Sequence, residues 1–213
     1  IGPNGAGKST VLDVISGKVK PKYGKVVFKD KNICGKSEHR IVRQGISRKF
    51  QTPTIFGNLK VYENMELSLR RRKGVFSSMT FKVKSYDKDK IHSVLNLVGL
   101  NDKVDIRAGI LSHGEKQWLE LGMSIIQEPL LLLVDEPVAG MTGKEREMTG
   151  QLLQKISQQS SVLVVEHDME FVRRIAKKVT VLHEGMILCE GTMDEVQNDP
   201  IVVKVYLGRG EEG

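Results

Sequence analysis

The sequence predicts an α/β fold in which helices cover both faces of a mostly parallel sheet. Two observations favour it, and a third adds a helical subdomain. Helical and strand-like segments alternate along most of the chain, as in proteins with parallel sheets. The runs at Leu130–Val134 and Ser161–Val165 have the character of strands that are buried on both faces. Residues 52 to about 127 are mainly helical instead, which indicates a helical subdomain inserted into a single domain spanning residues 1–213.

The first expected element is a helix that starts at Lys8 and stops near Gly17. Gly24 then introduces a strand at Lys25–Lys29, and a short helix at Ser37–Gln44 precedes a strand at Ile46–Phe50. This order of helix and strand is the pattern that builds a sheet with helices on its faces.

The helical subdomain, called the lobe below, and the remaining elements follow in order. Within the lobe, Asn58–His92 is helical and basic around a break at Gly74–Ser85, and the helix continues through Val98. After the strand at Leu130–Val134, the remaining elements are a helix at Lys144–Gln158, the strand Ser161–Val165, a helix at Met169–Lys177, a hairpin formed by Val179–His183 and Met186–Glu190 with its turn at Glu184–Gly185, and short helices within Thr192–Leu207.

Composition excludes several classes of protein. Hydrophobic residues make up 39% and charged residues 28%, as in a soluble globular protein and unlike a disordered or fibrous one. No apolar run reaches the ~20 residues that cross a bilayer, so we expect any membrane role to be peripheral. Cys34 and Cys189 lack metal-ligand spacing, which fits a reducing cytoplasm.

Charge is distributed unevenly. Residues 18–92 contain 20 Lys and Arg against 6 Asp and Glu, whereas the rest of the chain contains 13 against 20. Such a basic block could contact nucleic acid, anionic lipid or an acidic partner, and it is more often a solvated face.

A glycine-rich loop, GPNGAGKS at residues 2–9, satisfies the phosphate-loop pattern G-x-x-x-x-G-K-[ST]. Its glycines let the backbone curl so that successive N–H groups point inward, and the helix that follows adds the positive end of its dipole. A glycine-rich turn that matches by chance is the alternative. Lys8 would supply charge to the β- and γ-phosphates, and Ser9 a hydroxyl to Mg²⁺. The residues expected to contact nucleotide are Gly2, Pro3, Asn4, Gly5, Ala6, Gly7, Lys8, Ser9 and Thr10.

Two acids follow the apolar run in LLLLVDEP, residues 130–137. Ligands of open parallel sheets usually bind at the carboxyl ends of the strands, where these acids lie. Asp135 is expected to hold Mg²⁺ through water. Glu136 is expected to polarise the attacking water as the general base. The alternative, a solvated Asp-Glu-Pro turn, is disfavoured by the phosphate loop that accompanies it.

LSHGEKQ at residues 111–117 narrows the class of nucleotide-binding protein, because it resembles the LSGGQ signature of ABC ATPases. The resemblance implies that Ser112, Gly114 and Glu115 contact the γ-phosphate of ATP held by a second ABC ATPase subunit. A serine hydroxyl, a backbone N–H and a helix start also form an anion site on chemical grounds. Ser112 could otherwise be only the N-cap of that helix. His113 and Glu115 stand where the family usually has glycine and glutamine.

Other elements of the ABC pattern occur in the expected order. Gln51 matches the Q-loop glutamine, residues 138–142 occupy the D-loop with Thr142 in place of the usual Asp, and His167 matches the switch histidine. The resemblance implies that Gln51 contacts Mg²⁺ and the lytic water and that His167 contacts the γ-phosphate. Structural interpretations exist for both: Gln51 as a polar strand end and His167 as a residue at a helix start.

Longer stretches resemble one group of importers. KFQTPTIFGNLKVYENMELSL and the ending VYLGRG are similar to ATPases of the branched-chain amino acid group, and SHGEKQWLE with PVAGMT is most similar to the urea-transporter subunit. The resemblance implies ATP and Mg²⁺ as cofactors and ATP-driven solute import at the cytoplasmic face of the inner membrane. The implied partners are a second ATPase subunit in a homo- or heterodimer, permease subunits that face the basic segment after Gln51, and indirectly a periplasmic or extracellular solute-binding protein.

Two rival interpretations have weaker support. A soluble ABC ATPase acting on nucleic acid or ribosomes would use the basic block as its contact surface, but such relatives usually carry a second cassette or long coiled-coil insertions. We therefore expect no nucleic acid partner. A non-catalytic cassette is disfavoured by the presence of Lys8, Asp135, Glu136 and His167.

The family's usual domain also includes strands and an adenine-stacking aromatic residue upstream of the phosphate loop. We expect these to precede Ile1, so that residues 1–213 form an incomplete copy without competent ATPase activity. The strand that feeds the loop is expected in the centre of the sheet, beside the strand that ends at Asp135.

Overall fold

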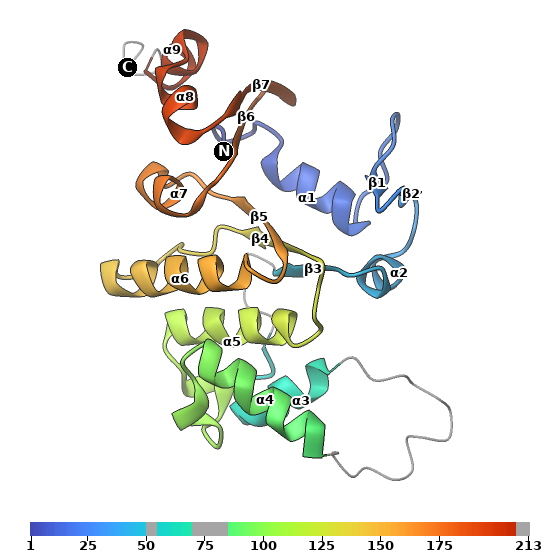
Figure 1. The fold of residues 1–213 in the computed structure, drawn as a ribbon, viewed down its shortest axis with the longest axis vertical. Coiled ribbons are helices and arrows are strands. Elements are labelled where there is room, and N and C mark those ends of the chain that lie inside the picture. The colour runs from blue at the N-terminus through green and yellow to red at the C-terminus, as the bar shows by residue number, and fades with distance from the viewer. Residues whose placement is uncertain (50–54, 70–84, 208–213) are drawn as a thin grey trace. The chain divides into compact units, whose positions relative to one another are not determined.

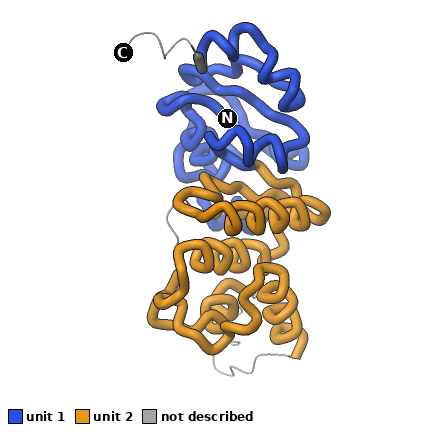
Figure 2. Tube along the Cα trace, turned by 90° about the vertical axis from the view of Figure 1, so that its left-hand side faces the viewer, with its two compact units in different colours: residues 1–44, 164–213 blue, residues 45–163 orange. Residues whose placement is uncertain are grey.

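The computed structural model describes residues 1–49, 55–69 and 85–207 (Figure 1). The chain divides into two compact units, unit 1 with residues 1–44 and 164–213 and unit 2 with residues 45–163 (Figure 2). Unit 2 is therefore one continuous segment, whereas unit 1 is assembled from both ends of the sequence. No helix among the described residues is long and apolar enough to span a membrane.

The first part of unit 1 contains the phosphate loop and α1 (Lys8–Ser16), which is flanked by two glycines in the left-handed conformation, Gly7 and Gly17. A small antiparallel hairpin follows, formed by β1 (Val27–Phe28) and β2 (Lys31–Asn32), and then α2 (Glu38–Arg43). The sequence predicted only one strand here. The hairpin turn uses Lys29 and Asp30, which have positive φ without being glycine, so the usual turn signal is absent.

The second part of unit 1 packs helices around an antiparallel pair of strands. Val179 and Val181 lie two residues apart on the same buried face of β6, and Ile1 packs against the same core. The predicted hairpin with its turn at Glu184–Gly185 is confirmed. The elements of this part are α7 (Met169–Ile175), β6 (Val179–His183), β7 (Met186–Gly191), α8 (Met193–Asn198) and α9 (Pro200–Leu207).

A sheet with the order β3-β4-β5 carries the acidic pair of unit 2 at the end of β4. β3 (Ile46–Lys49) pairs in parallel with β4 (Leu131–Asp135), and β5 (Ser161–Val165) runs from unit 2 into unit 1. Leu132–Val134 is fully buried, as predicted. β5 differs from the prediction, because Leu163 is 38% exposed. An apolar run predicts a strand, but it does not determine which faces of that strand are covered.

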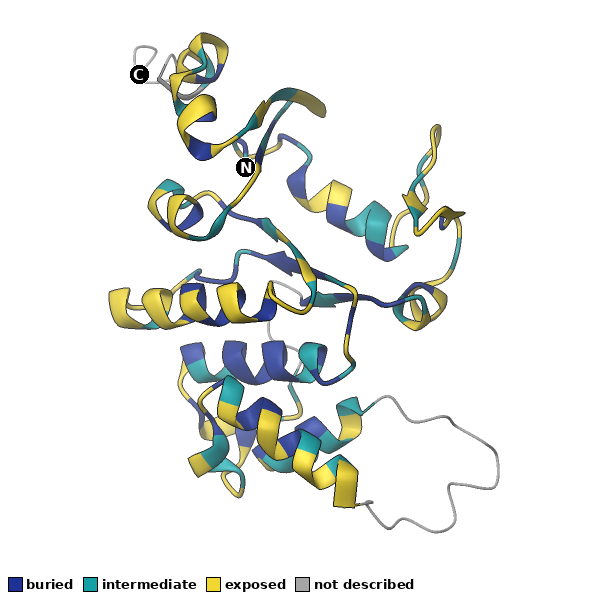
Figure 3. Cartoon of the chain, viewed as in Figure 1, coloured by how far each residue is buried: buried dark blue, intermediate teal, exposed yellow. Residues whose placement is uncertain are grey.

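Helices surround α5 (His113–Ile125) in unit 2, and α5 is buried along most of its length (Figure 3). It packs against β3 and against helices on its other sides. The indole Nε1 of Trp118 donates a hydrogen bond of 2.9 Å to Thr149 Oγ1 on a neighbouring helix. The other helices are α3 (Val61–Ser68), α4 (Ser85–Leu97), α6 (Gly143–Ile156) and two short 3-10 turns, Asn101–Lys103 and Ala108–Ile110.

The predicted neighbour of the strand that feeds the phosphate loop is wrong. We expected the strand that feeds the phosphate loop to lie beside β4, but β3 and β5 already pair with the two edges of β4. Ile1 instead pairs with β6. Its nitrogen donates to Thr180 O at 2.9 Å, and its carbonyl accepts from Leu182 N at 2.9 Å, which is the alternation found between parallel strands.

Candidate nucleotide-binding site

The phosphate loop has the backbone that its sequence predicts. Gly2, Gly5 and Gly7 have φ values of 152°, 80° and 96°, a region that other residues rarely occupy. The loop is closed by a hydrogen bond of 3.2 Å from Ala6 N to Pro3 O. The three glycines are therefore required by the path of the chain.

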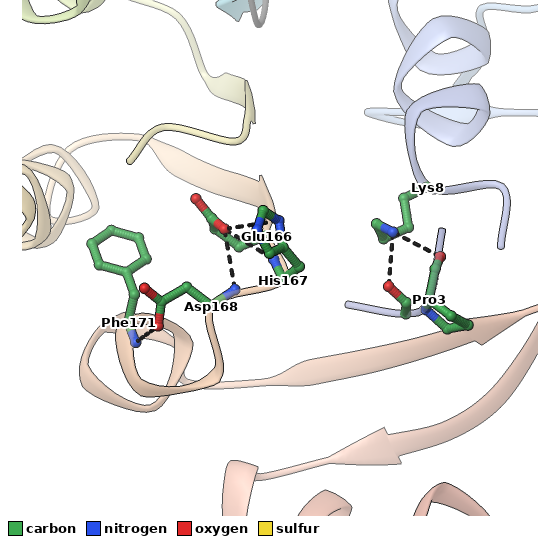
Figure 4. A network of polar contacts seen from close by, with 7 residues as sticks. Pro3, Lys8, Glu166, His167, Asp168 and Phe171 are labelled. Atoms are coloured by element: carbon green, nitrogen blue, oxygen red, sulfur yellow. Dashed lines mark hydrogen bonds and ion pairs between the residues drawn. The ribbon is translucent and has the colours of Figure 1, made fainter. Parts of the chain in front are cut away.

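Lys8 lies over this loop. Its ammonium donates to Gly2 O at 2.7 Å and to Pro3 O at 2.9 Å, and its side chain is largely buried (Figure 4). Ser9 and Thr10 are exposed on the first turn of α1, at the end where the helix dipole is positive. The loop thus combines a cation, two hydroxyls and a helix start, which is chemistry suited to a phosphate chain.

His167, the expected switch histidine, lies just after β5, within unit 1. The carboxylate of the buried Glu166 accepts from the backbone N–H of His167 at 2.9 Å and of Asp168 at 3.3 Å (Figure 4). Asp168 in turn caps α7 by accepting from Phe171 N at 3.0 Å. The imidazole of His167 is 63% exposed, with Nδ1 3.7 Å from Glu166 Oε2. The turn therefore holds the His167 backbone while its ring faces solvent.

The end of β4 presents the two acids in different environments. Asp135 is buried, and its Oδ2 lies 3.3 Å from the guanidinium of Arg48 on β3. Glu136 is half-buried and has a φ of 44°. A non-glycine residue with positive φ is uncommon, and such conformations concentrate at functional sites. The backbone thus turns sharply at the residue that we expect to be the general base.

The side chains of Arg48 and Lys49 on β3 lie in the interior of unit 2, which the sequence interpretation missed. Lys49 has a fully buried side chain, and its Nζ lies 3.8 Å from Oε2 of the buried Glu120 on α5. Arg48 and Lys49 are consecutive on β3, so they point to opposite faces of the sheet. Arg48 and Lys49 both belong to the basic block of residues 18–92, for which a solvated face is the more common state. The signal that could have found them is the occurrence of two cations within the strand pattern ISRKF.

The signature motif forms the start of α5. Ser112 Oγ accepts from Glu115 N at 3.2 Å, and the carboxylate of Glu115 accepts from Ser112 N at 2.9 Å, which is a reciprocal capping box. Partial burial alone would raise the pKa of Glu115. Hydrogen bonds from the Lys103 ammonium and from Ser112 outweigh it and leave the pKa below its ordinary value. Ser112 is therefore an N-cap, one of its two expected roles.

A contact between the signature and the D-loop involves His113, which replaces the family's usual glycine. His113 Nε2 lies 3.2 Å from Ala139 O and 2.8 Å from the amide of Gln117. Gln117 Nε2 also donates to Ala139 O at 3.3 Å. A Cβ on Gly140 would lie 3.4 Å from His113 Nε2, so the ring lies against the D-loop backbone. Thr142 caps α6 in the same way that Ser112 caps α5.

The expected site residues fall into two groups. Unit 1 contains the residues from Gly2 to Thr10 and His167, and unit 2 contains Ser112, Gly114, Glu115, Asp135 and Glu136. Gln51, expected at the metal and the lytic water, lies outside the described residues.

The chemistry of the expected metal ligands fits Mg²⁺, because the Ser9 hydroxyl and the Asp135 carboxylate are hard oxygen donors. Within the described ranges, no group of three or more His, Cys, Asp and Glu side chains could hold a metal ion. A phosphate-bound Mg²⁺ does not need such a group, since it usually takes only one or two protein oxygens and completes its coordination with phosphate and water.

A phosphate loop that leads into a helix, an acidic pair at the end of a buried parallel strand and a serine-capped signature helix define an ATP-binding cassette. The chain belongs to the ABC transporter family, whose profile matches residues 1–139. The profile of the branched-chain amino acid ATP-binding cassette transporter matches residues 186–212. Members of this family are ATPases that power transport.

Individual relatives agree with this assignment. The chain is 31% identical over 218 residues to the high-affinity branched-chain amino acid transport ATP-binding protein LivG of Escherichia coli K12, an alignment that covers 98% of this chain and 85% of LivG. It is 32% identical over 219 residues to a probable LivG of Methanocaldococcus jannaschii, with the same coverage.

Solved structures agree as well. The ADP conformation of MJ1267, an ATP-binding cassette of an ABC transporter, superposes with a TM-score of 0.83 at 30% identity, covering 98% of this chain and 86% of that one. A nucleotide-free cassette gives a TM-score of 0.81 at 28% identity, covering 96% and 85%. These structures confirm the predicted α/β P-loop fold.

Proposed function

We propose that this chain binds ATP with Mg²⁺ and that Glu136 serves as the general base for its hydrolysis. The observation that supports the proposal best is the phosphate loop, where Lys8 bridges two loop carbonyls over a backbone curled by three glycines. When nucleotide binds, phosphate oxygens would replace those two carbonyls as hydrogen-bond acceptors of the Lys8 ammonium. Main-chain N–H groups and the start of α1 would supply further positive charge to the phosphates.

The other residues have roles that follow from their chemistry. Mg²⁺ would be held by Ser9 and Asp135 and would neutralise charge on the phosphates when bound. The carboxylate of Glu136 accepts a proton from the attacking water. His167 and Gln51 would contact the γ-phosphate and the water. Ser112, Gly114 and Glu115 would meet the ATP of a second subunit, which requires two ATPase chains arranged head to tail.

The two ATPase chains would close on ATP and open after hydrolysis, and this cycle would drive permease subunits. The chain would therefore act peripherally at the cytoplasmic face of the membrane. A solute-binding protein would take part indirectly. The relatives described above are named for branched-chain amino acid transport, and we propose this class of cargo first. Urea is the second cargo to test, because SHGEKQWLE and PVAGMT resemble the urea-transporter subunit.

Glu136→Gln tests the catalytic assignment. The variant keeps the size and polarity of the side chain but loses the base, so hydrolysis should fall by about 10²–10⁴-fold while the affinity for ATP is retained. The measurements are steady-state phosphate release and nucleotide binding, each on wild type and variant of the full-length protein. Turnover within about threefold of wild type would exclude Glu136 as the base.

Transport and its cargo need a separate experiment. Deletion of the gene should reduce uptake of labelled leucine if the cargo is an amino acid, or of labelled urea if it is urea, and a Lys8→Ala copy should fail to restore it. Stimulation of ATP hydrolysis by nucleic acid, together with unchanged uptake of both solutes, would favour the soluble ABC ATPase instead.

A further inference from the structure

The end of β6 and the turn that follows it contact the phosphate loop at two places. At the entrance, Leu182 N donates to Ile1 O at 2.9 Å, and a Cβ built on Gly2 would lie 2.2 Å from Leu182 O. Further along, Gly185 N donates to Ala6 O at 3.1 Å, and a Cβ on Gly7 would lie 3.6 Å from Gly185 Cα. These contacts connect backbone to backbone, within unit 1.

The hydrogen bond to Ala6 has a directional consequence. In a trans peptide the carbonyl and the following N–H point in opposite directions, and the described chain contains no cis peptide. When Gly185 holds the Ala6 carbonyl toward the hairpin, the N–H of Gly7 must point away from it. That N–H is one of the donors at the start of α1, where phosphate is expected.

The turn itself has a geometry suited to this task. Glu184 and Gly185 form a two-residue hairpin loop between His183 and Met186, and both have positive φ, 49° and 79°. Such loops match the right-handed twist of the strands they connect. The pairing of β6 and β7 also shifts register between Val181 and Leu182, and such irregularities bend a hairpin and re-aim its end.

We propose that Gly185 is a positioning residue for nucleotide binding, which fixes the Ala6–Gly7 peptide so that the Gly7 N–H is presented to a phosphate oxygen. The proposal rests on the proposed function of the loop. Gly185 touches no nucleotide; it acts through the loop backbone. Nothing lies within 4 Å of a Cβ at residue 185, so a substitution acts through the backbone conformation of the turn and not through a clash.

The test compares Gly185→Val with two other variants. Gly185→Asn retains the N–H and tolerates positive φ. Gly24→Val is the matched control, since Gly24 also has positive φ, 87°, also has open space at its Cβ, and also lies in unit 1. The readouts are affinities for ADP and for inorganic triphosphate by calorimetry, and the thermal unfolding midpoint without ligand.

Forcing a non-glycine residue into the left-handed region costs about 1–2 kcal/mol, which corresponds to roughly 5–30-fold in affinity if the turn gives way. Gly185→Val should weaken both ligands by about that factor, Gly185→Asn by less than about threefold, and Gly24→Val should lower only the unfolding midpoint. Equal affinities of folded Gly185→Val and Gly24→Val would overturn the proposal.

Two further results keep the outcomes distinct. If Gly185→Val fails to fold, Gly185→Ala against Gly24→Ala gives the same comparison, with the NMR shift of the Gly7 amide as an added readout that should move only in the first. Wild-type protein that binds neither ADP nor triphosphate would contradict the proposed function itself. Wild-type binding with an unmoved Gly7 amide in Gly185→Ala would contradict only the role of Gly185.

Discussion

The two units hold their candidate site residues in different ways. In unit 1, backbone groups fix the phosphate loop against β6 and its turn, through the hydrogen bonds of Leu182 and Gly185 and the close approach of Gly2 to β6. In unit 2, the ends of β3 and β4 and the start of α5 are fixed by charged side chains, through Arg48 with Asp135, Lys49 with Glu120 and Lys103 with Glu115.

The difference teaches where each region is vulnerable. A region held by backbone contacts tolerates changes of side chain but has no room for an added Cβ where two backbones meet, as they do at Gly2. The two buried pairs of unit 2, Arg48 with Asp135 and Lys49 with Glu120, each depend on both partners, because removing one leaves the other in an interior that cannot solvate it. Three substitutions, taken from the largest expected effect to the smallest, test this contrast.

Lys49→Ala should have the largest effect. Removing one partner of a buried ion pair leaves the other charge uncompensated and typically costs about 3–5 kcal/mol, so the free energy of unfolding should fall by that amount in chemical denaturation. Lys60→Ala is the control within unit 2, since it breaks the exposed pair with Asp105 and should change stability far less. The double variant Lys49→Met/Glu120→Leu should recover most of the loss, and a double variant as unstable as the single one would contradict a charge-based role.

Gly2→Ala should have an intermediate effect in unit 1. The new Cβ would lie 2.2 Å from Leu182 O, and overpacking of this kind costs about 1–3 kcal/mol. Because the clash is with backbone, the loop must shift, and ADP affinity should fall together with stability. Gly5→Ala is the control: it keeps the penalty of positive φ but meets no atom within 4 Å. If the two variants lost equal stability, the close approach of Gly2 to β6 would make no contribution to stability.

Ser112→Ala should have the smallest effect on stability. The loss of an N-cap costs about 0.5–2 kcal/mol. Thr192→Ala is matched to it, because Thr192 caps α8 in unit 1 with the same Glu-containing box. The two should destabilise similarly in thermal unfolding. Only Ser112→Ala should also weaken ATP-driven dimerisation in a Glu136→Gln background, and dimerisation at wild-type levels would remove Ser112 from the cross-subunit contact.

The sequence predicted the backbone-held region better than the charge-held one. Gly2, Gly5 and Gly7 indicate positive φ directly, because a glycine pattern states a backbone requirement. The hairpin at Glu184–Gly185 could be predicted for the same reason. Its hydrogen bond to Ala6 could not, since a bond between distant backbone groups leaves no pattern in the side chains.

The charge-held region shows the limit of composition. Arg48 and Lys49 were counted in a basic block for which solvation is the usual state, yet both side chains are buried against acids that are 87 and 71 residues away in the sequence. Partners at such separations follow from the register of β3 with β4 and from the packing of α5, which tertiary structure decides. The exposure of Leu163 on β5 and the pairing of Ile1 with β6 were missed for the same reason.

The contact between Trp118 and Thr149 gives the protein an optical reporter of its own. Trp118 is the single tryptophan of the sequence, so all indole emission comes from one site, on the helix that begins with the signature motif. The residue is 7% exposed and its Nε1 is hydrogen-bonded to Thr149 on α6, which places a polarity-sensitive fluorophore at the junction of two helices. Any rearrangement that separates α5 from α6 would admit water to the indole and shift its emission to longer wavelength, without a label.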